Sequence, residues 1–394
     1  MKVYTTKDIL EIEEKYKNDK KLSRSETIWF QNIPGTRKAG VKFLLDGHEL
    51  REYVRSVNSM EYFANNFCKI KDPCGKEVNI TLRDYQKDIL KQFDNKYSIL
   101  FKSRQMGITA VLCINFLHYI LSNDNKFIIL ITNKGETSKE ILRKFKDLYK
   151  LLPFYLKIGV TCWNEKQIVF ENGSRIQAVS RSKDVNPSPS LSDIIYIDEF
   201  SHIPQHIIVP IYLDIIKNMK EDAKLIIASG PNGFNFFYDL IQRSELPSPH
   251  PDKNMFKTTR LYWWQVPGRQ DTKLKFIDIK LKRYGTTKEK VLENLKDMGL
   301  DIYEKVIGAD TYQETYYFIK YDKDNEKTNI HNIRQIDMNR IPLSDIAHIS
   351  NWREEETAMI GGEAMFNQEY NLCFVADERE YYKRFPERII FVKE

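Results

Sequence analysis

Cysteine and long apolar runs are both scarce in this sequence of 394 residues. The five cysteines are an odd number and include no CxxC pair, so the sequence indicates neither a disulfide framework nor a zinc cluster. No apolar run is long enough to cross a membrane, and the N-terminus, MKVYTTKDILEIEEKYK, has the charged pattern of a helix rather than of a signal peptide. We therefore expect a soluble protein of a reducing, intracellular compartment.

A strong charge of one sign is also missing. Lys and Arg number 61 and Asp and Glu 55, which gives a net charge of +6. So small an excess permits binding to a polyanion without demanding it. The hydrophobic content of 42% is enough to furnish a core, either of two domains or of one large α/β unit. Composition predicts a folded, enzyme-sized protein and leaves its chemistry open.

Short apolar runs alternate with helical stretches from residue 97 onward. The runs are YSILF, KFIILIT, DIIYIDE and KLIIAS. This alternation predicts an α/β fold with a mostly parallel, doubly wound sheet. Asn172-Gly173 lies between two alternating segments and predicts a hairpin that adds antiparallel strands at an edge of that sheet. Residues 180–193 are rich in Ser, Pro and Asp and predict a surface loop.

We expect three segments along the chain. Residues 1–60 have helical spacing and predict an N-terminal helical segment, and residues 61–245 contain the strand-like runs and predict the core. Residues 246–394 predict a lid and linker subdomain. Within it, residues 273–327 contain 12 Lys or Arg and 11 Asp or Glu, which is typical of a solvated surface insertion. This insertion contains TTKEKVLENLKDMGL, with the periodicity of a helix, and TYYFIKY, with the character of a strand.

The sharpest local feature is YSILFKSRQMGIT at 97–109, an apolar strand that runs through a short polar turn into a helix. Backbone N–H groups in such a turn can hold a phosphate, and the Thr109 hydroxyl can reach Mg²⁺. The segment departs from G-x-x-x-x-G-K-[ST], because Lys102 or Ser103 stands at the first glycine position and Ile108 at the lysine position. An ordinary strand-to-helix turn explains this segment, taken alone, at least as well.

A second feature is IIYIDEF at 194–200, where a buried run ends in Asp198 and Glu199. Carboxylates at the carboxyl end of a strand face the ligand crevice of an α/β fold, and their burial is costly unless they bind a metal or act on water. We expect Asp198 to hold Mg²⁺ through water and Glu199 to activate the attacking water. A strand that merely exits into solvent is the alternative.

Two weaker features accompany these. Tyr85 and Gln86 lie just before the turn, and a glutamine amide can read the edge of adenine with one donor and one acceptor. Ser229 ends the run KLIIAS, where its hydroxyl can sense a γ-phosphate. Each of the two alone is more simply a helix start or a plain turn. His202 and His206 are four residues apart, but Pro204 between them disfavours a helical metal pair, so we interpret both as loop histidines.

In this order, the four features resemble the ATPase domain of tailed-bacteriophage terminase large subunits, the motors that package DNA. The resemblance covers roughly residues 60–245 and returns at FNQEYNLCF (366–374). It implies a P-loop NTPase fold with a small C-terminal lid subdomain, which binds ATP and Mg²⁺. In the family, LRDYQ is the adenine motif, SRQxG the phosphate loop and YIDE the pair of carboxylates, while the strand before PNGFNFFYDL is the coupling motif.

KSRQMGIT also resembles a variant loop of the family, K-S-x-R-x-G-x-[ST]. That variant implies that Lys102 is the phosphate lysine and Arg104 a second cation, so that Lys102, Arg104 and Glu199 are the catalytic residues. A lysine at a strand end can fold across the loop, because its flexible stem delivers a point charge. The resemblance assigns nucleotide contacts to Tyr85, Gln86, Lys102, Ser103, Arg104, Gln105, Met106, Gly107, Ile108, Thr109 and Ser229, and metal contacts to Asp198 and Thr109.

The resemblance also implies partners: double-stranded DNA, a viral portal and a small terminase subunit, with assembly as a homo-oligomeric ring on the portal in the host cytoplasm. In isolation, a monomer is the alternative. Many members have an Arg-Gly pair where this chain has Asn186-Pro187, so the trans-acting arginine finger stays open and Arg181 is a weak candidate. The family also has a nuclease domain, but only about twenty residues follow FNQEYNLCF, and we expect no nuclease activity from this chain.

Two other functions stay open at this stage. A helicase-like P-loop ATPase shares the phosphate loop, the acidic pair and the strand-end serine. A catalytically weak nucleotide-binding subunit is conceivable because Ile108 replaces the loop lysine. ATP turnover separates the second alternative from the motor, and DNA unwinding separates the first.

Overall fold

The computed structural model describes residues 3–18, 27–71, 76–180, 189–266, 269, 273–276, 302–307, 314–319, 346–349 and 351–374. The sequence predictions for Arg181, for Asn186-Pro187 and for a helix at 286–300 lie outside these residues. The described chain forms two compact units. The first contains described residues of 1–100, 107–229 and 239–259, and the second those of 101–106, 230–238 and 260–394.

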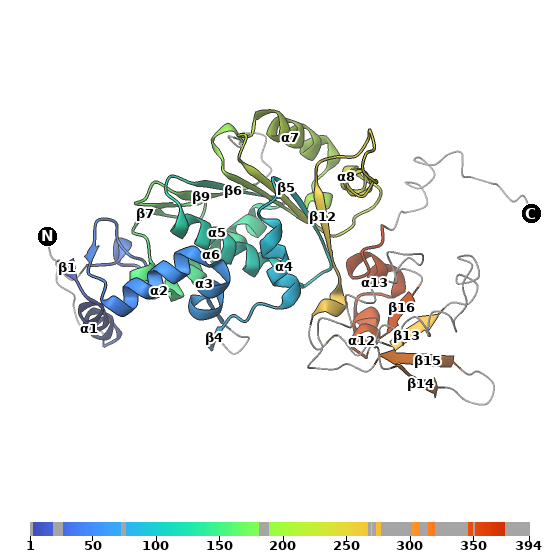
Figure 1. The fold of residues 1–394 in the computed structure, drawn as a ribbon, viewed down its shortest axis with the longest axis horizontal. Coiled ribbons are helices and arrows are strands. Elements are labelled where there is room, and N and C mark those ends of the chain that lie inside the picture. The colour runs from blue at the N-terminus through green and yellow to red at the C-terminus, as the bar shows by residue number, and fades with distance from the viewer. Residues whose placement is uncertain are drawn as a thin grey trace, which may run out of the picture. The chain divides into compact units, whose positions relative to one another are not determined.

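The largest sheet has eight strands in the order β12-β5-β11-β10-β6-β9-β8-β7 (Figure 1). They are β5 (Tyr97–Lys102), β6 (Phe127–Thr132), β7 (Val160–Trp163), β8 (Gln167–Phe170), β9 (Arg175–Ser180), β10 (Ile194–Asp198), β11 (Lys224–Ser229) and β12 (Lys257–Leu261). Strands β9, β6, β10 and β11 pair in parallel, whereas β7 and β8 add antiparallel strands at one edge. The predictions of a mostly parallel sheet and of a hairpin at Asn172-Gly173 are confirmed.

Helices cover both faces of this sheet. The crossovers through α5 (Ile108–Ser122) and α6 (Gly135–Leu151) run along the sheet in one direction, from β5 to β6 and on to β9, whereas α7 (Gln205–Asn218) leads back from β10 to β11. Right-handed crossovers in opposite directions place their helices on opposite faces, as Figure 1 shows. Strands β6 and β10 are buried along their whole length, which explains their unbroken apolar sequences. The doubly wound α/β prediction is confirmed.

Four α-helices lie in the described N-terminal part of the first unit. It contains α1 (Thr6–Lys17), α2 (Gly47–Asn58), α3 (Met60–Phe67) and α4 (Asp84–Gln92). Capping boxes begin α1 at Thr5 and α2 at Asp46. In each, the N-cap side chain accepts a hydrogen bond from a backbone N–H of the first turn, and the carboxylate three residues later accepts one from the N-cap N–H. Two small strand pairs were not predicted, β1 (Val3–Tyr4) with β2 (Lys42–Phe43) and β3 (Lys69–Lys71) with β4 (Glu77–Asn79).

The strand β12 was not predicted either, because KTTRL carries a single buried apolar residue, Leu261, as an edge strand can. The prediction that His206 lies in a loop is wrong. Pro204 is the N-cap of α7, so His206 falls in the first turn of that helix, while His202 ends the short 3₁₀ turn η5 (Phe200–His202). A proline just before a helix starts it rather than breaking it, because its fixed φ suits the entry.

The second unit has its own aromatic core and a four-stranded antiparallel sheet in the order β14-β15-β13-β16. The strands are β13 (Lys273–Phe276), β14 (Ile302–Ile307), β15 (Glu314–Ile319) and β16 (Ile346–Ile349), and the helices α12 (Asn351–Met359) and α13 (Glu363–Glu369) follow. Trp263 stacks on Trp352 with ring centroids 5.4 Å apart and meets Phe366 edge to face. The strand expected at TYYFIKY is thus present as β15. No helix in the described ranges has the length and apolar character to cross a membrane.

Candidate active site

The loop predicted to hold phosphate connects β5 to α5. Two of its residues adopt left-handed backbone conformations, Gln105 with φ +58° and Gly107 with φ +71°. A Cβ atom at Gly107 would lie 3.2 Å from Nε2 of Gln86 as well, so glycine fits this position on two grounds. Gly107 is the N-cap of α5, whose first N–H groups point toward the loop as in anion-binding turns.

The boundary between the two compact units falls inside this loop, between Met106 and Gly107. Within the second unit, the first half of the loop is bound to the C-terminal segment. The amide of Ser103 donates to Leu261 O at 2.8 Å and its hydroxyl to Tyr370 O at 2.5 Å, while the amide of Arg104 donates to Glu369 O at 2.9 Å. Ser103 is therefore fixed by protein partners in this structure, and its predicted phosphate contact stays a prediction.

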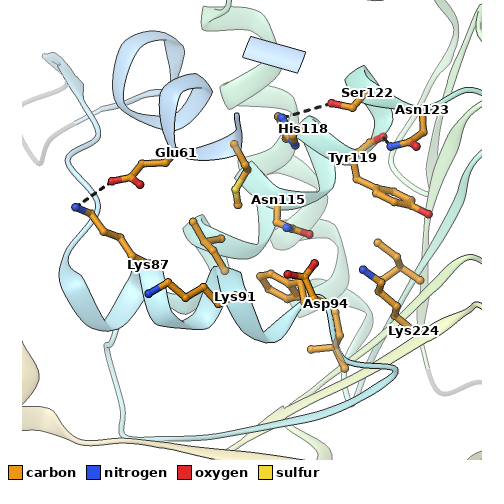
Figure 2. A pocket seen from close by; sticks show the side chains of 15 residues that line it. Glu61, Lys87, Lys91, Asp94, Asn115, His118, Tyr119, Ser122, Asn123 and Lys224 are labelled. Atoms are coloured by element: carbon orange, nitrogen blue, oxygen red, sulfur yellow. Dashed lines mark hydrogen bonds and ion pairs between the residues drawn. The ribbon is translucent and has the colours of Figure 1, made fainter. Parts of the chain in front are cut away.

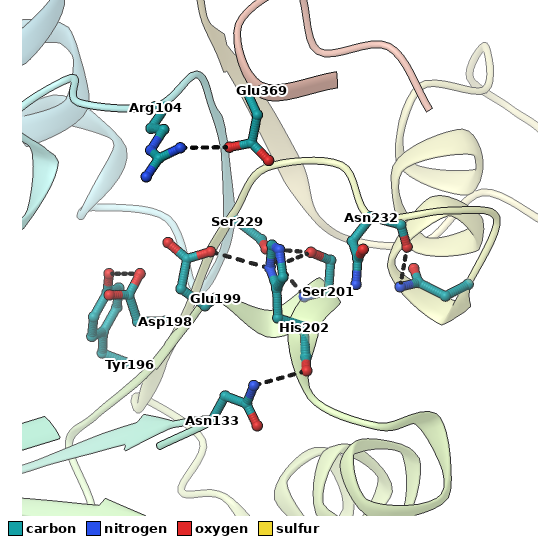
Figure 3. A network of polar contacts seen from close by, with 11 residues as sticks. Arg104, Asn133, Tyr196, Asp198, Glu199, Ser201, His202, Ser229, Asn232 and Glu369 are labelled. Carbon is teal, nitrogen blue, oxygen red and sulfur yellow. Dashed lines mark hydrogen bonds and ion pairs between the residues drawn. The ribbon is translucent and has the colours of Figure 1, made fainter. Parts of the chain in front are cut away.

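The Arg104 guanidinium extends outward from the loop. Its side chain is 57% exposed, and Nη1 lies 4.0 Å from the Glu369 carboxylate (Figure 3). An ion pair this long and exposed contributes less than about 1 kcal/mol. Glu369 was not predicted as a site residue, because nothing in FNQEYNLCF indicates a contact with a loop far earlier in the chain.

Gln86 of the proposed adenine motif contacts this loop within the first unit. It is 8% exposed, its Oε1 accepts a bond from the Arg83 amide at 3.0 Å, and its Nε2 faces Gly107. Tyr85 is buried, and its hydroxyl accepts a bond from Arg83 Nη1 at 3.1 Å. The structure thus places Gln86 beside the loop, whereas Tyr85 belongs to the core.

The acidic pair lies at the carboxyl end of β10. Asp198 is 5% exposed, pairs in register with Thr132 of β6 and Ala228 of β11, and accepts a bond from Tyr196 Oη at 2.8 Å. Burial and the nearby Asp198 raise the pKa of Tyr196 well above its ordinary value, so this phenol keeps its proton and stabilises the carboxylate. A carboxylate oxygen at the end of a buried strand is a ligand of the kind that Mg²⁺ prefers.

Glu199 follows with a left-handed backbone, φ +51° and ψ 41°, which turns its side chain out of the strand. That side chain is 36% exposed, and its Oε2 lies 3.2 Å from Nδ1 of His202. Ser229 is fully buried at the end of β11, where its hydroxyl accepts a bond from the amide of Ser201 at 3.1 Å. Figure 3 shows Glu199, His202, Ser201 and Ser229 as one polar network.

A pocket of about 390 Å³ lies at the amino-terminal ends of β10 and β11 (Figure 2). It is lined by α3, α4, α5 and the starts of β10 and β11, including Ile194 and Lys224. A 3.1 Å ion pair between Lys87 and Glu61 crosses its rim. None of the predicted site residues lines this pocket. Ile194 and Lys224, which line it, begin β10 and β11, whereas Asp198 ends β10, so the pocket and the acidic pair lie at opposite ends of the strands. Among the residues described, no group of three or more His, Cys, Asp and Glu side chains is placed to hold a metal.

Residues 99–276 match the family described as terminase large subunit, T4likevirus-type, N-terminal. Among solved structures, the large terminase ATPase domain of Thermus phage P74-26 is similar at 14% identity over 75% of this chain and 94% of its own, with a TM-score of 0.40. The large terminase of bacteriophage HK97 is similar at 17% identity over 62% of this chain and 51% of its own, with a TM-score of 0.43. The large terminase of another thermophilic bacteriophage, in complex with ADP, is similar at 14% identity over 45% of each chain, with a TM-score of 0.34.

Proposed function

We propose that this chain hydrolyses ATP and uses the energy to move double-stranded DNA into a viral capsid, because residues 99–276 match the family of terminase large subunits. The observation that carries the proposal is the acidic pair at the carboxyl end of β10, with Asp198 buried and Glu199 turned outward. Next to it in the sheet, β11 ends at Ser229. A buried parallel strand that ends in two carboxylates suits phosphoryl transfer to water.

In this proposal each residue has one role. Gln86 contacts the adenine edge, the loop 102–109 surrounds the phosphates, and Lys102 and Arg104 stabilise the charge that develops on the γ-phosphoryl oxygens. Asp198 and Thr109 would hold Mg²⁺, which neutralises phosphate charge when bound. Glu199 orients and activates the attacking water. The Ser229 hydroxyl, at the end of β11, donates a hydrogen bond to the γ-phosphate.

We also propose the partners that the family implies: duplex DNA, a viral portal and a small terminase subunit, with a ring of copies on the portal in the host cytoplasm. DNA cleavage is not part of the proposal. We keep the division into residues 1–60, 61–245 and 246–394 as a proposed domain organisation.

The proposal is tested by ATP turnover together with displacement of a third strand from a DNA triplex, which reports translocation along a duplex. We expect hydrolysis, displacement that depends on ATP, and no separation of the strands of a forked duplex. Asp198→Asn should weaken nucleotide binding only when magnesium is present. Separation of the forked duplex would favour a helicase, hydrolysis without displacement would contradict the coupling, and no hydrolysis would leave a nucleotide-binding subunit.

A further inference from the structure

The turn η5 joins the ends of two neighbouring strands through side chains. Ser201 Oγ lies 2.8 Å from Ser229 Oγ at the end of β11, and 3.1 Å from Nδ1 of His202. The same Nδ1 lies 3.2 Å from Oε2 of Glu199, the residue that follows β10. The result is a continuous chain of polar atoms from Ser229 to the carboxylate that we propose as the catalytic base (Figure 3).

Burial and several hydrogen bonds stabilise this turn. Ser201 and Ser229 are buried, and the Ser201 amide donates to Ser229 Oγ at 3.1 Å. The turn is closed by a bond from the His202 amide to Glu199 O at 2.9 Å, and Asn133, which directly follows β6, donates to His202 O at 2.9 Å. The left-handed backbone of Glu199 costs on the order of 1 kcal/mol for a residue other than glycine. The ends of β6, β10 and β11 thus all hold the histidine in place.

The chain of hydrogen bonds has two arrangements, because Nδ1 of a neutral histidine either carries a proton and donates, or has a lone pair and accepts. If Ser229 donates to Ser201, then Ser201 can donate to Nδ1, and His202 offers no proton to Glu199. If Ser201 donates to Ser229 instead, the ring proton sits on Nδ1 and can be donated to Glu199. The ring is 40% exposed, so water can carry the proton between Nε2 and Nδ1.

We propose that His202 is a positioning residue for Glu199, and that the direction of the Ser229–Ser201 hydrogen bond decides whether His202 holds that carboxylate. This inference rests on the proposed ATPase function. When the Ser229 hydroxyl donates to a phosphate oxygen, it no longer donates to Ser201. Ser201 then donates to Ser229, and His202 donates to Glu199 and fixes it for attack. When the phosphate leaves, Ser229 donates to Ser201 again, and His202 no longer donates to the Glu199 carboxylate.

The test is ATP turnover by His202→Ala, Ser201→Ala and His202→Asn, with His206→Ala as the matched control on the exposed first turn of α7. We expect His202→Ala and Ser201→Ala each to lower kcat about tenfold, with KM for ATP changed less than about twofold, because a mispositioned base affects the transition state more than binding. His202→Asn should retain more activity than His202→Ala, since an asparagine amide can donate from near the position of Nδ1. His206→Ala should match the parent.

Two combinations separate positioning from general damage. The double variant Ser201→Ala/His202→Ala should be no slower than His202→Ala, because both changes break one chain. In a Glu199→Gln background, His202→Ala should have no further effect. Parental kcat in His202→Ala, or an equal loss in the Glu199→Gln background, would overturn the inference while leaving the ATPase proposal intact. A parent chain that does not hydrolyse ATP would overturn both.

Discussion

Lys102 stands at the point where β5 ends and the phosphate loop begins, and its side chain is half-buried. The position usually held by a loop lysine is occupied here by Ile108, which is 4% exposed and packs into the core. A lysine at 108 would have to bury its ammonium or move its helix turn, so our proposal takes the positive charge for the phosphates from elsewhere in the loop. Lys102 and Arg104 are the cations that the loop offers.

We therefore expect Lys102→Ala to abolish measurable ATP hydrolysis and Arg104→Ala to lower turnover by about 10³-fold, the magnitude typical of a cation that stabilises a transferring phosphoryl group. Steady-state ATP turnover, with thermal unfolding measured on each variant, checks this. Lys91→Ala, which removes an exposed lysine of α4, serves as the control. Normal hydrolysis by Lys102→Ala would move the phosphate role to Arg104 or to another subunit.

The candidate site was predictable from sequence only where chemistry and local pattern coincide. Asp198 and Glu199 end a run of buried residues, and Gly107 opens a helix, so both were found. Two hydrogen bonds were not predicted, from Ser103 to Tyr370 O and from Arg104 to Glu369 O, because segments more than 260 residues apart in sequence meet only in the fold. The contacts that link His202 to Ser229 through Ser201 were missed because Ser229 lies on the next strand of the sheet.

At the scale of elements, the central strands were the easiest to predict, since burial on both faces makes them continuously apolar. The strand β12 escaped because an edge strand needs little apolar sequence, and α7 escaped because Pro204 looked like a breaker when it is an N-cap. A lysine in the segment between η3 (Phe154–Leu156) and β7 is buried, which the sequence did not predict. Lys157 is 5% exposed, and its Nζ donates to Lys150 O at 2.9 Å.

Burial lowers the pKa of Lys157 from 10.5 to about 8, with Glu13 opposing the shift. Below that pKa, both the folded and the unfolded chain carry the proton, and the full cost of burying the charge is present. Between about 8 and 10.5 the unfolded chain binds more protons than the folded one, so this residue makes the free energy of unfolding rise with pH, by about 3 kcal/mol in total. Lys157→Met removes that dependence.

We expect Lys157→Met to be more stable than the parent near neutral pH, and its advantage to shrink toward about pH 10 as the parent loses the buried charge. Urea unfolding of both proteins at the two pH values measures the difference. Lys126→Met, at a more exposed lysine that forms an ion pair with Asp193, controls for the general loss of a positive charge. An advantage that stays constant with pH would contradict the burial of a charged Lys157.

At the scale of the whole molecule, composition did not predict the binding partner, because a net charge of +6 on 394 residues neither requires nor excludes a nucleic acid. Nor did any pattern indicate that the chain would divide within its phosphate loop, between Met106 and Gly107. Such a division depends on contacts made by the C-terminal segment, which reach Ser103 and Arg104 through backbone groups that carry no sequence signature.

A translocase must hold DNA by its phosphates, since it has to move along any sequence. We therefore expect affinity for duplex DNA to be independent of sequence and to fall steeply between about 50 and 200 mM salt, as counterion release requires. Fluorescence anisotropy with two unrelated duplexes across a salt series measures this. A strong preference for one duplex at high salt would count against a translocase.

The central claim, that the acidic pair at the carboxyl end of β10 catalyses ATP hydrolysis, is tested most directly by turnover in Glu199→Gln. Because the amide keeps the shape of the side chain but cannot take a proton, we expect ATP binding to persist while kcat falls by about 10²–10⁴-fold, the usual contribution of a general base. Glu221→Gln, the same change at an exposed site after α7, should leave turnover unchanged. Hydrolysis at the parental rate by Glu199→Gln would contradict the account.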